Sequence, residues 1–419
     1  MKLLIIADDL TGALDTGVQL VKAGVIPHVI IDLTKPLPRI TDTQAFVLNA
    51  ETRHLPKDDA YQIVFNIVKR ALNAGFDHIY KKTDSALRGN IGSELAALLD
   101  ASGETLLPFF PSYPKMNRFT VDGVQYIDGT PVSESVFGID PFEPVRYSNI
   151  ADIVAQQSSI PVQIIPEGQP FSVKADHVAI AVFDCKCSQS FEALARQLKP
   201  HIFQTKISAG CAGFAEFLPS IFELKGKKSV FSLPEKDILV CSGSLNPITI
   251  RQLDMAIVNG FECFNISNYD ARSNLSHPDF RESFAQNILT MAQNCPNLIL
   301  RVGKSDLEMV STINGTTEST FEKAGQQIAS NIGALLSEVV RMGLDRNLII
   351  TGGDILQSFI TQVCCDEVIP LGEIESGIVL SLVVIKNKKI TVVSKSGGFG
   401  SQDIFSKIAS YLQKIHFGL

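Results

Sequence analysis

The chain has 419 residues, which is too long for one compact core and suits two domains of about 150–250 residues each. Hydrophobic residues make up 45% of the chain and charged residues 19%, which excludes a disordered or coiled-coil protein. The formal net charge is −7, so the protein as a whole has no attraction for nucleic acid or an anionic membrane, and any basic site must be local.

The eight cysteines are scattered along the chain and form no CxxC pair. This usage predicts reduced, mostly buried thiols in a cytoplasmic protein. The apolar run after Lys2 is short and leads into two aspartates, so it indicates a buried strand and no signal peptide. No apolar run approaches the roughly 20 residues that a membrane-spanning helix needs.

The first half of the chain alternates short apolar runs with segments of helical periodicity. Strands are predicted at Lys2–Ile6, His28–Asp32, Ala45–Leu48, His78–Tyr80, Val178–Phe183 and Gln204–Ile207. Helices are predicted at Gly12–Ala23, Pro56–Ala74, Asn90–Ala101 and Gln189–Leu198. This alternation favours a mainly parallel sheet covered on both faces. The segment Pro108–Pro144 lacks clear periodicity and is expected to form a long, irregular, functional loop.

A polar, basic stretch, Leu224–Lys236, is the best candidate for a linker, because a second α/β alternation begins after it. The second half has predicted strands at Asp237–Cys241, Phe261–Ile266, Asn297–Arg301, Asn347–Ile350, Ile378–Ile385 and Ile390–Ser394. Its predicted helices are Pro247–Val258, Thr320–Met342, Asp354–Val363 and Gln402–Gln413. We therefore expect two α/β domains with mainly parallel sheets, residues 1–230 and 237–419, and an active site in the cleft between them.

The first predicted strand runs straight into Asp8 and Asp9, with Thr11 and Gly12 at the start of a helix. In open parallel sheets, ligands bind beyond the carboxyl ends of the strands, where these carboxylates fall. One aspartate is expected to face a ligand and the other to brace the loop. The alternative is a turn capped by Thr11, with acidic residues that complement the helix dipole.

A second polar loop, KKTDSALRGN at residues 81–90, also follows a predicted strand and precedes a helix. It combines two ammonium groups, a guanidinium, a carboxylate and two hydroxyls, which suits a small polyhydroxy acid. The alternative is a solvated basic loop whose charges partly cancel. Arg53 follows the strand Ala45–Leu48 and could grip a carboxylate, although a lone arginine is more often a surface residue.

Three glycine-bearing loops follow strands in the second half and precede helices: CSGSLNP at 241–247, TGGD at 351–354 and KSGGFGS at 395–401. Glycines expose backbone N–H groups to a phosphate, and a helix N-terminus adds a favourable dipole. Such turns are common in α/β domains, but three of them together favour nucleotide binding. No GxxxxGK[ST] motif and no GxGxxG after the first strand occur, so neither a P-loop nor a standard dinucleotide fold is supported.

These motifs resemble those of the four-carbon acid sugar kinase family, whose members phosphorylate threonate, erythronate or 3-oxo-tetronate with ATP. The resemblance covers nearly the whole chain and rests on IADDLTGALDTGVQL (6–20), KKTDSALRGN (81–90), PSYPKMNRFTVDGVQYIDGTPVSES (111–135), SGSLNPITIRQ (242–252), TGGD (351–354) and KSGGFG (395–400). Two departures lie in the irregular segment. The family usually has a Gly-Arg pair where this chain has Asn117-Arg118, and a Thr where it has Ser135.

The resemblance implies an N-terminal substrate domain and a C-terminal nucleotide domain. The residues that it assigns to the acid sugar are Asp9, Arg53, Lys82, Thr83, Asp84 and Ser85, and Arg88 of the same loop is a further candidate. The residues that it assigns to ATP are Ser244, Gly352, Gly353, Asp354 and Gly397, and the adjacent Gly398 is a further candidate. The resemblance and the size of the chain also suggest a homodimer.

We therefore expect ATP-dependent phosphorylation of the C4 hydroxyl of a tetronate. D-threonate ranks first, because residues 15–19 are more similar to the threonate and erythronate kinases than to the 3-oxo-tetronate kinases. Lys82, Arg53 and Arg88 would hold the carboxylate, and Asp9 or Asp84 would orient the hydroxyls. Asp354 and Asp9 are both candidates for the proton acceptor, with Asp354 preferred.

Mg²⁺ is expected from the chemistry of phosphoryl transfer, but no carboxylate cluster marks its ligands. The alternatives within the family are D-erythronate and 3-oxo-tetronate kinases. The alternative from another class is a nucleotide-binding regulator without turnover. The carboxylates at Asp9, Asp84 and Asp354 argue against such an inactive protein.

Overall fold

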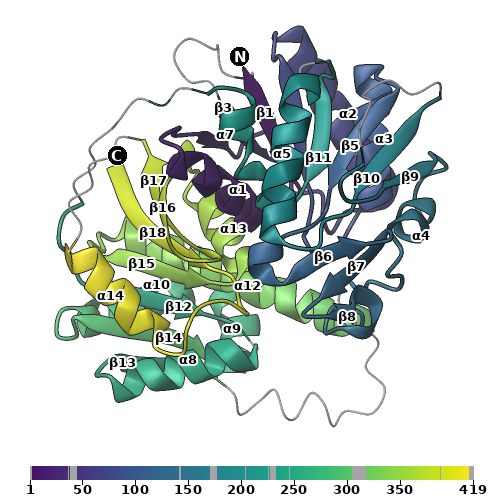
Figure 1. Ribbon diagram of the computed structural model, residues 1–419. Helices are drawn as coiled ribbons and strands as arrows, with labels where there is room; N and C mark the ends of the chain where they lie inside the picture. The colour runs from purple at the N-terminus through teal and green to yellow at the C-terminus, as the bar shows by residue number, and fades with distance from the viewer. Residues whose placement is uncertain are drawn as a thin grey trace. The chain divides into compact units, whose positions relative to one another are not determined.

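The computed structural model describes residues 2–35, 37, 45–140, 143–169, 177–202, 204–224, 226, 233–244, 246–303, 318–386 and 388–414 (Figure 1). The chain divides into two compact units, Met1–Lys227 and Lys228–Leu419. Within the stretch expected to be a linker, residues 225 and 227–232 lie outside the described residues. No helix in the described part of the chain is long and apolar enough to cross a membrane.

The first unit contains a wholly parallel sheet with the strand order β2-β3-β1-β4-β11-β5-β10-β9. The strands are β1 Leu3–Ala7, β2 His28–Ile30, β3 Ala45–Asn49, β4 His78–Lys82, β5 Leu106–Phe110, β9 Val162–Ile165, β10 Ala179–Phe183 and β11 Ile207–Gly210. Most of these strands are apolar and buried along their whole length, as expected for a parallel sheet with helices on both faces.

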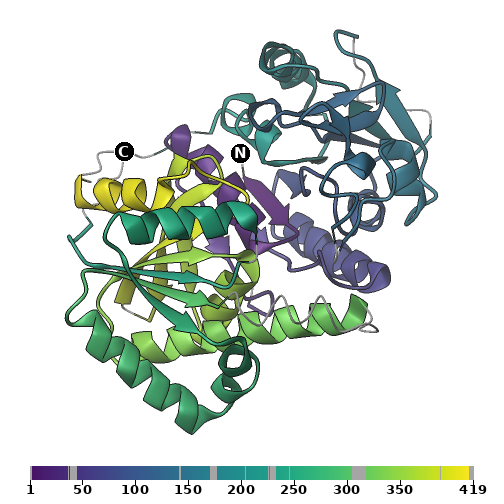
Figure 2. The same ribbon diagram turned by 90° about the horizontal axis from the view of Figure 1, so that it is seen from below.

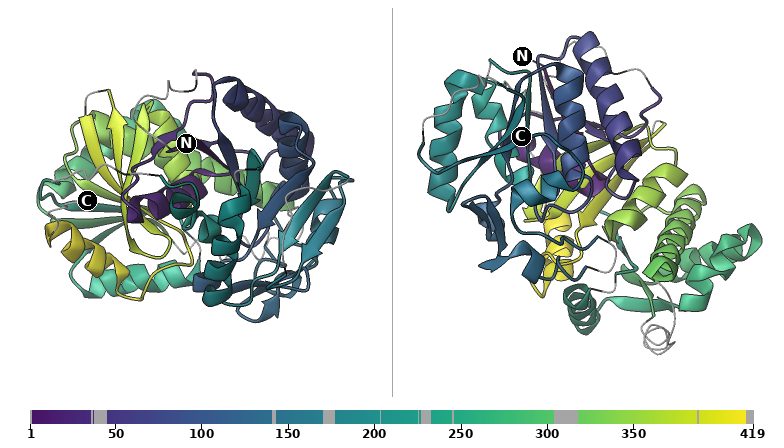
Figure 3. Two further views of the ribbon diagram at one scale, coloured as in Figure 1. Left: turned by 45° about the horizontal axis from the view of Figure 1, so that its top comes forward. Right: turned by 90° about the vertical axis from the view of Figure 1, so that its right-hand side faces the viewer.

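Helices cover both faces of this sheet. They are α1 Leu10–Lys22, α2 Lys57–Asn73, α3 Ile91–Ser102, α4 Ile150–Ala155, α5 Ser188–Ile202, α6 Ala212–Ala215 and α7 Leu218–Ile221. Helices α2 and α3 pack against each other and share one hydrophobic core with the strands (Figure 3, right). On the other face Phe214 of α6 stacks on Phe110 of β5, with ring centroids 3.8 Å apart.

The segment Pro108–Pro144 is more regular than the sequence indicated. It begins within β5 and continues into a small antiparallel sheet formed by β6 Arg118–Val121, β7 Val124–Ile127 and β8 Thr130–Pro131. Tight turns separate these strands, with positive φ at Asp122 and Asp128, each followed by a glycine. Because the strands are short and rich in polar residues, they carry no strong alternation of apolar and polar positions.

The second unit contains a sheet with the order β13-β14-β12-β15-β18-β17-β16. The strands are β12 Ile238–Ser242, β13 Glu262–Ile266, β14 Asn297–Val302, β15 Asn347–Thr351, β16 Glu367–Glu375, β17 Ile378–Ile385 and β18 Lys388–Lys395. The strands from β13 to β18 in this order pair in parallel, whereas β16, β17 and β18 form an antiparallel meander. The predicted α/β class with mainly parallel sheets is confirmed, with this meander as an addition.

The helices of the second unit are α8 Pro247–Val258, α9 Asn268–Arg272, α10 Pro278–Ala292, α12 Glu318–Arg341, α13 Gly353–Gln362 and α14 Ile404–Lys414. Helices α8 and α14 share a hydrophobic core with one face of the sheet. Helices α10 and α12 pack against each other on the opposite side, as Figure 2 shows for the green part of the chain. Prediction from the sequence missed α10 and β16, and placed β11 about three residues too early.

All eight cysteines are free thiols, and Cys185, Cys211, Cys241, Cys295 and Cys365 are buried. This agrees with the expectation from their spacing.

Candidate active site

The polar loops of the first unit meet because their strands are neighbours in register. Ala7, the last residue of β1, pairs with Asn49 of β3 on one side and with Lys82 of β4 on the other. The chain leaves β1 towards β2 and β3, and then crosses to β4 on the opposite side of β1. This reversal is the topological switch point at which open parallel sheets bind ligands. The loops 8–12, 50–53 and 83–88 therefore converge at one place.

Asp9 and Asp8 have different tasks in the loop after β1. Asp9 is the N-cap of α1, and its Oδ1 accepts a hydrogen bond of 2.9 Å from the Gly12 N–H. The helix thus begins at Leu10 with Asp9 as its cap, and the expected cap at Thr11 was wrong. Asp8 is 3% exposed, and its backbone carbonyl accepts hydrogen bonds from the N–H groups of Thr52 and Arg53. Asp8 therefore ties the loop after β3 to the end of β1.

Arg53 is engaged by three carboxylates. Its Nε donates to Asp8 Oδ2 at 2.8 Å and its Nη1 donates to Asp9 Oδ2 at 2.7 Å. Its Nη2 lies 3.8 Å from Asp84 Oδ1. Burial acts to lower the pKa of Arg53, but the neighbouring carboxylates raise it well above its ordinary value. Arg53 is a buried cation and not a surface residue, and it organises the aspartates of two loops.

Lys82 lies against the same aspartates. Its Nζ is 3.2 Å from Asp8 Oδ1 and 3.6 Å from Asp9 Oδ1. Burial acts to lower its pKa, but Asp8 and Asp9 raise it above the ordinary value. Gly12 is required beside this contact, because a Cβ there would overlap Lys82 Nζ and Asp9 Oδ1. A larger residue at position 12 would therefore displace the ammonium group.

Hydrogen bonds to the carboxylate of Asp84 hold the KKTDSALRGN loop together. It accepts hydrogen bonds from the backbone N–H groups of Ala86 and Arg88, and Arg88 Nε and Nη2 add a two-point contact at 3.0 and 2.9 Å. Burial favours the neutral acid, but Arg88 and Arg53 outweigh it and hold the pKa of Asp84 well below its ordinary value. Leu87 and Gly89 have positive φ, which lets the chain turn tightly around the carboxylate.

Thr83 and Ser85, the two hydroxyl residues of this loop, have different surroundings. Thr83 is fully buried, and its hydroxyl has no hydrogen-bond partner among the described residues. Ser85 Oγ accepts a hydrogen bond from Arg118 Nη1, and Ser85 O accepts one of 3.0 Å from Gln125 Nε2. The predicted substrate residues Asp9, Arg53, Lys82, Asp84 and Arg88 thus form one ion network, with Thr83 and Ser85 next to it in the chain.

Sequence reasoning missed three charged residues here. Lys81 and Glu94 form a fully buried ion pair at 2.8 Å beneath the loop. Glu51 accepts hydrogen bonds from Leu10 N–H at 3.1 Å and from Asn49 Nδ2 at 2.6 Å. Burial, with the charge of Asp9, raises the pKa of Glu51 to about 7. Lys81 belongs to the KKTDSALRGN motif and Glu51 lies two residues before Arg53, but only the folded structure shows what each side chain contacts.

The glycine loops of the second unit also converge. Ser242 at the end of β12 pairs with Thr351 of β15, and Thr351 pairs with Lys395 of β18. The chain goes from β12 to β13 and β14 on one side and then to β15 on the other, so a switch point lies between β12 and β15. Three glycine-bearing loops therefore share one edge of the sheet, which is an arrangement that suits phosphate binding.

Direct contacts join these loops. Asn246 caps α8 by accepting a hydrogen bond of 2.9 Å from Ile248 N–H, and Ser244 Oγ accepts one of 3.2 Å from Asn246 N–H. Gly397 approaches closely, since a Cβ placed on it would lie 3.4 Å from Ser244 Oγ. Gly352 has a φ of 105°, which only glycine adopts readily, and it precedes α13. Asp354 is exposed in the first turn of that helix.

Lys395 is a buried cation at the centre of these loops. It is 2% exposed, and its Nζ donates only to neutral oxygens, namely Thr249 Oγ1 at 3.3 Å, Ser396 O at 3.2 Å and Gly397 O at 3.4 Å. It forms no ion pair within the described part of the chain. Burial lowers its pKa from 10.5 to about 8. A buried ammonium group without a counter-charge suits an anionic ligand.

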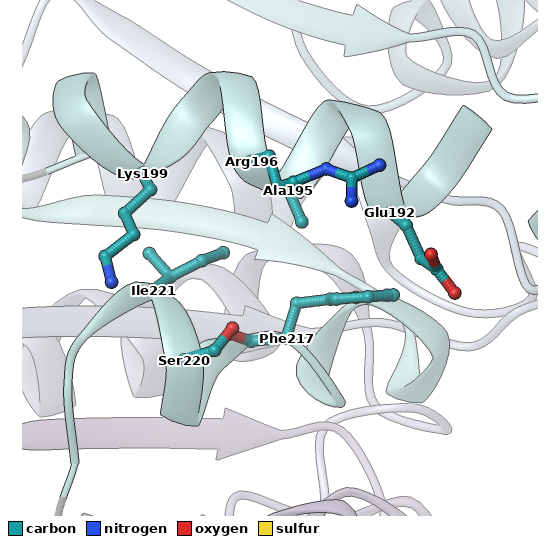
Figure 4. Close-up of a pocket in the computed structure, with 7 residues that line it drawn as sticks. All are labelled: Glu192, Ala195, Arg196, Lys199, Phe217, Ser220 and Ile221. Carbon is teal, nitrogen blue, oxygen red and sulfur yellow. The ribbon is translucent and has the colours of Figure 1, made fainter. Parts of the chain in front are cut away.

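Two further features of the structure are weaker evidence for the position of the active site. The described residues include no group of three or more His, Cys, Asp or Glu side chains that could hold a metal ion. A shallow pocket lies between α5 and α7, lined by Glu192, Ala195, Arg196, Lys199, Phe217, Ser220 and Ile221 (Figure 4). Figure 4 shows separate charged side chains on its α5 side rather than a convergent polar set, so the switch points remain the candidate sites.

Comparison with known families agrees with this division. Residues 3–218 match the family described as "Sugar-binding N-terminal domain", and residues 239–405 match "Nucleotide-binding C-terminal domain". A D-threonate kinase of Salmonella typhimurium is 27% identical over 435 residues and covers 100% of both chains. The chain belongs to the four-carbon acid sugar kinase family. The resemblance found in its motifs is thereby confirmed.

Other members of the four-carbon acid sugar kinase family act on different acids. A D-erythronate kinase of Heliobacterium modesticaldum is 34% identical over 165 residues, which is 39% of this chain and 38% of that protein. A 3-oxo-tetronate kinase of Methylobacterium radiotolerans is 23% identical over 432 residues, or 96% and 97% of the two chains. Family membership alone therefore does not identify which four-carbon acid is the substrate.

Solved structures support the fold. A Salmonella typhimurium protein has a TM-score of 0.79 at 20% identity, covering 97% of this chain and 98% of its own. A Haemophilus influenzae protein has a TM-score of 0.73 at 20% identity, covering 98% and 100%. The same fold thus extends over nearly the whole chain.

One departure from the family pattern has a structural explanation. Asn117 stands where the family usually has glycine, and its φ is 51°. Asparagine is one of the few non-glycine residues that adopt this left-handed conformation at little cost. The turn that presents Arg118 is therefore preserved.

Proposed function

We propose that the protein is an ATP-dependent kinase that phosphorylates the C4 hydroxyl of a four-carbon sugar acid, with D-threonate as the substrate and 4-O-phospho-D-threonate as the product. The observation that carries the proposal is the pairing, in one chain, of two different switch-point sites. One is a buried network of aspartates and cations, and the other is a set of glycine loops around an uncompensated ammonium group. D-threonate is chosen because a relative that matches over its whole length is a D-threonate kinase.

In this proposal the first unit binds the acceptor. Carboxylate oxygens of Asp9 and Asp84 accept hydrogen bonds from sugar hydroxyls, and Thr83 offers a hydroxyl that has no partner among the described residues. Arg53, Lys82 and Arg88 hold the aspartates in place, because each cation contacts at least one of them. Such a pre-ordered set reduces the entropy that is lost when a small, flexible acid binds.

The second unit binds the donor. The loops that contain Ser244, Gly352, Gly353, Gly397 and Gly398 surround the phosphates, the N–H groups of Gly353, Gly397 and Gly398 donate to them, and the ammonium group of Lys395 neutralises part of their charge. Mg²⁺ would accompany the nucleotide and share this neutralisation. Magnesium held largely by phosphates needs only one or two protein carboxylates, which agrees with the lack of a carboxylate cluster among the described residues.

The reaction joins the C4 oxygen of the acid to the γ-phosphorus of ATP and breaks the bond between that phosphorus and the bridging oxygen of ADP. The proton of the C4 hydroxyl passes to a carboxylate. Asp354 suits this task better than Asp9. Asp9 already accepts hydrogen bonds from Gly12 and Arg53, whereas Asp354 is exposed beside the donor loops.

The test is an assay of the purified protein with Mg-ATP and D-threonate, L-threonate, D-erythronate or 3-oxo-tetronate. We expect the highest kcat/KM with D-threonate, followed by release of ADP and a product phosphorylated at C4. A higher kcat/KM with another acid would reassign the substrate. No ADP release with any of the four would refute the kinase proposal and favour a nucleotide-binding regulator.

A further inference from the structure

Arg118 differs from the other cations around the acid-binding loops in having no carboxylate partner. It is the first residue of β6, and it is 9% exposed. Arg53 and Arg88 each form ion pairs with aspartates, and Lys82 does so too. Arg118 forms no ion pair with any residue that the structure describes. Its Nη1 donates to Ser85 Oγ, and its Nε has no hydrogen-bond partner there.

The other cations of the ion network are paired without Arg118. Arg53 and Lys82 face Asp8 and Asp9, and Arg88 faces Asp84 and, at 3.8 Å, Asp140. These three cations therefore have carboxylate partners within the protein. Arg118 adds one positive charge next to them. Asp84, the carboxylate that attracts it most, is already bound by Arg88, and Asp15 attracts it more weakly.

The surroundings of Arg118 keep its side chain near the KKTDSALRGN loop. Its backbone carbonyl accepts a hydrogen bond of 2.8 Å from Tyr113 N–H, and its N–H donates to Tyr113 O at 3.2 Å. Its guanidinium carbon lies 5.2 Å from the ring centroid of Phe137. The guanidinium of Arg88 lies at the same distance from that ring, so two cations share one aromatic side chain.

Burial and the neighbouring charge of Arg88 make the ionised form of Arg118 costly. Both effects act to lower its pKa below the ordinary value, whereas the carboxylates raise the pKa of Arg53 and Arg88. An anion beside Arg118 would remove this cost. A carboxylate is well suited, because a guanidinium offers five N–H donors and can bind both carboxylate oxygens at once.

We propose that Arg118 is the residue that recognises the carboxylate of the acid sugar, and that Arg53, Lys82 and Arg88 serve to position the aspartates. This inference rests on the proposed function. It makes Arg118 a specificity determinant, because it favours a sugar acid over a neutral four-carbon sugar derivative.

The test compares the binding of D-threonate and of D-threonamide, in which a neutral amide replaces the carboxylate and the hydroxyls are kept. Dissociation constants are measured by calorimetry or NMR titration for the wild type, R118Q and R118K. We expect the wild type to bind the acid about 30-fold more tightly than the amide, as a charge-assisted hydrogen bond allows. R118Q should bind both about equally, and R118K should keep part of the preference.

The control is K115Q, which removes an exposed lysine of the same segment that pairs with Glu216. It should keep the full preference for the acid. Circular dichroism shows whether each variant is folded, and R118K keeps the test decisive if R118Q is not. The inference is overturned if a folded R118Q still prefers the acid, or if it loses affinity for acid and amide equally. If the wild type binds and phosphorylates no tetronate, the proposed function fails together with this inference.

Discussion

Replacement of Lys395 by methionine should stabilise the second unit at neutral pH while it weakens ATP binding. The pKa of this buried lysine is lowered from 10.5 to about 8. Between these two pH values the unfolded chain holds a proton that the folded chain lacks, so the stability of the wild type rises with pH across that window. Below pH 8 the folded protein carries the full cost of the buried charge.

The magnitude follows from the shift in pKa. A pKa lowered from 10.5 to about 8 corresponds to about 3 kcal/mol at pH 7, since a tenfold change in an equilibrium constant is about 1.4 kcal/mol. The lost hydrogen bonds to Thr249, Ser396 and Gly397 are 3.2–3.4 Å long and neutral, so they offset only part of this. We therefore expect K395M to be more stable than the wild type by about 2 kcal/mol at pH 7. This advantage should largely disappear between pH 7 and pH 10.

The assay is urea denaturation of both proteins across this pH range, followed by far-UV circular dichroism because the chain contains no tryptophan. The difference between the two variants is the decisive quantity, since tyrosines and cysteines titrate in both and cancel. ATP binding by K395M should be weaker by about 10-fold or more at pH 7. A difference in stability that does not change with pH would refute the argument that Lys395 is an uncompensated buried charge.

Three other substitutions test the proposed roles. Asp9→Asn keeps an acceptor for the helix cap but removes the charge that faces Arg53, so turnover should fall at least ~100-fold. The affinity for ATP, measured by calorimetry, should not change, and unchanged turnover would exclude Asp9 from the site. Gly12→Ala introduces a Cβ that overlaps Lys82 Nζ, so the KM for the acid should rise about 10-fold or more, and an unchanged KM would show that the ammonium position is unimportant. Asp354→Asn should lower kcat by about 10²–10⁴-fold while both ligands still bind. Normal turnover would show that another residue is the general base.

The sequence allowed the convergence of the loops to be predicted because parallel strands place their carboxyl ends together. The strand before Asp8 and the strand before Lys82 are short, apolar and followed by helices, and they are neighbours in the sheet. The same reasoning grouped the glycine loops, and β12, β15 and β18 lie side by side. Patterns of this kind report which face and which end of an element a residue occupies.

Partners of individual side chains could not be predicted in the same way. Arg53 was expected to be either a ligand for the substrate or a surface residue, whereas it is buried among aspartates from two other loops. Its partners are 31 to 45 residues away in sequence, and their choice depends on the register of β1, β3 and β4. The role of Arg118 depends on a short antiparallel sheet whose strands are too brief to show a period.

The two uncompensated cations suggest how the protein distributes its stability. Arg118 and Lys395 are both buried, and neither forms an ion pair with a described residue, although the chain supplies three carboxylates for the cluster around Arg53. A buried charge without a partner destabilises the folded state, so such positions are retained only where a ligand provides the missing charge. The acid and the nucleotide would then each stabilise the unit that binds it. In both cases the anion of the ligand would pair with the buried cation, so binding would remove the unfavourable free energy of an unpaired buried charge.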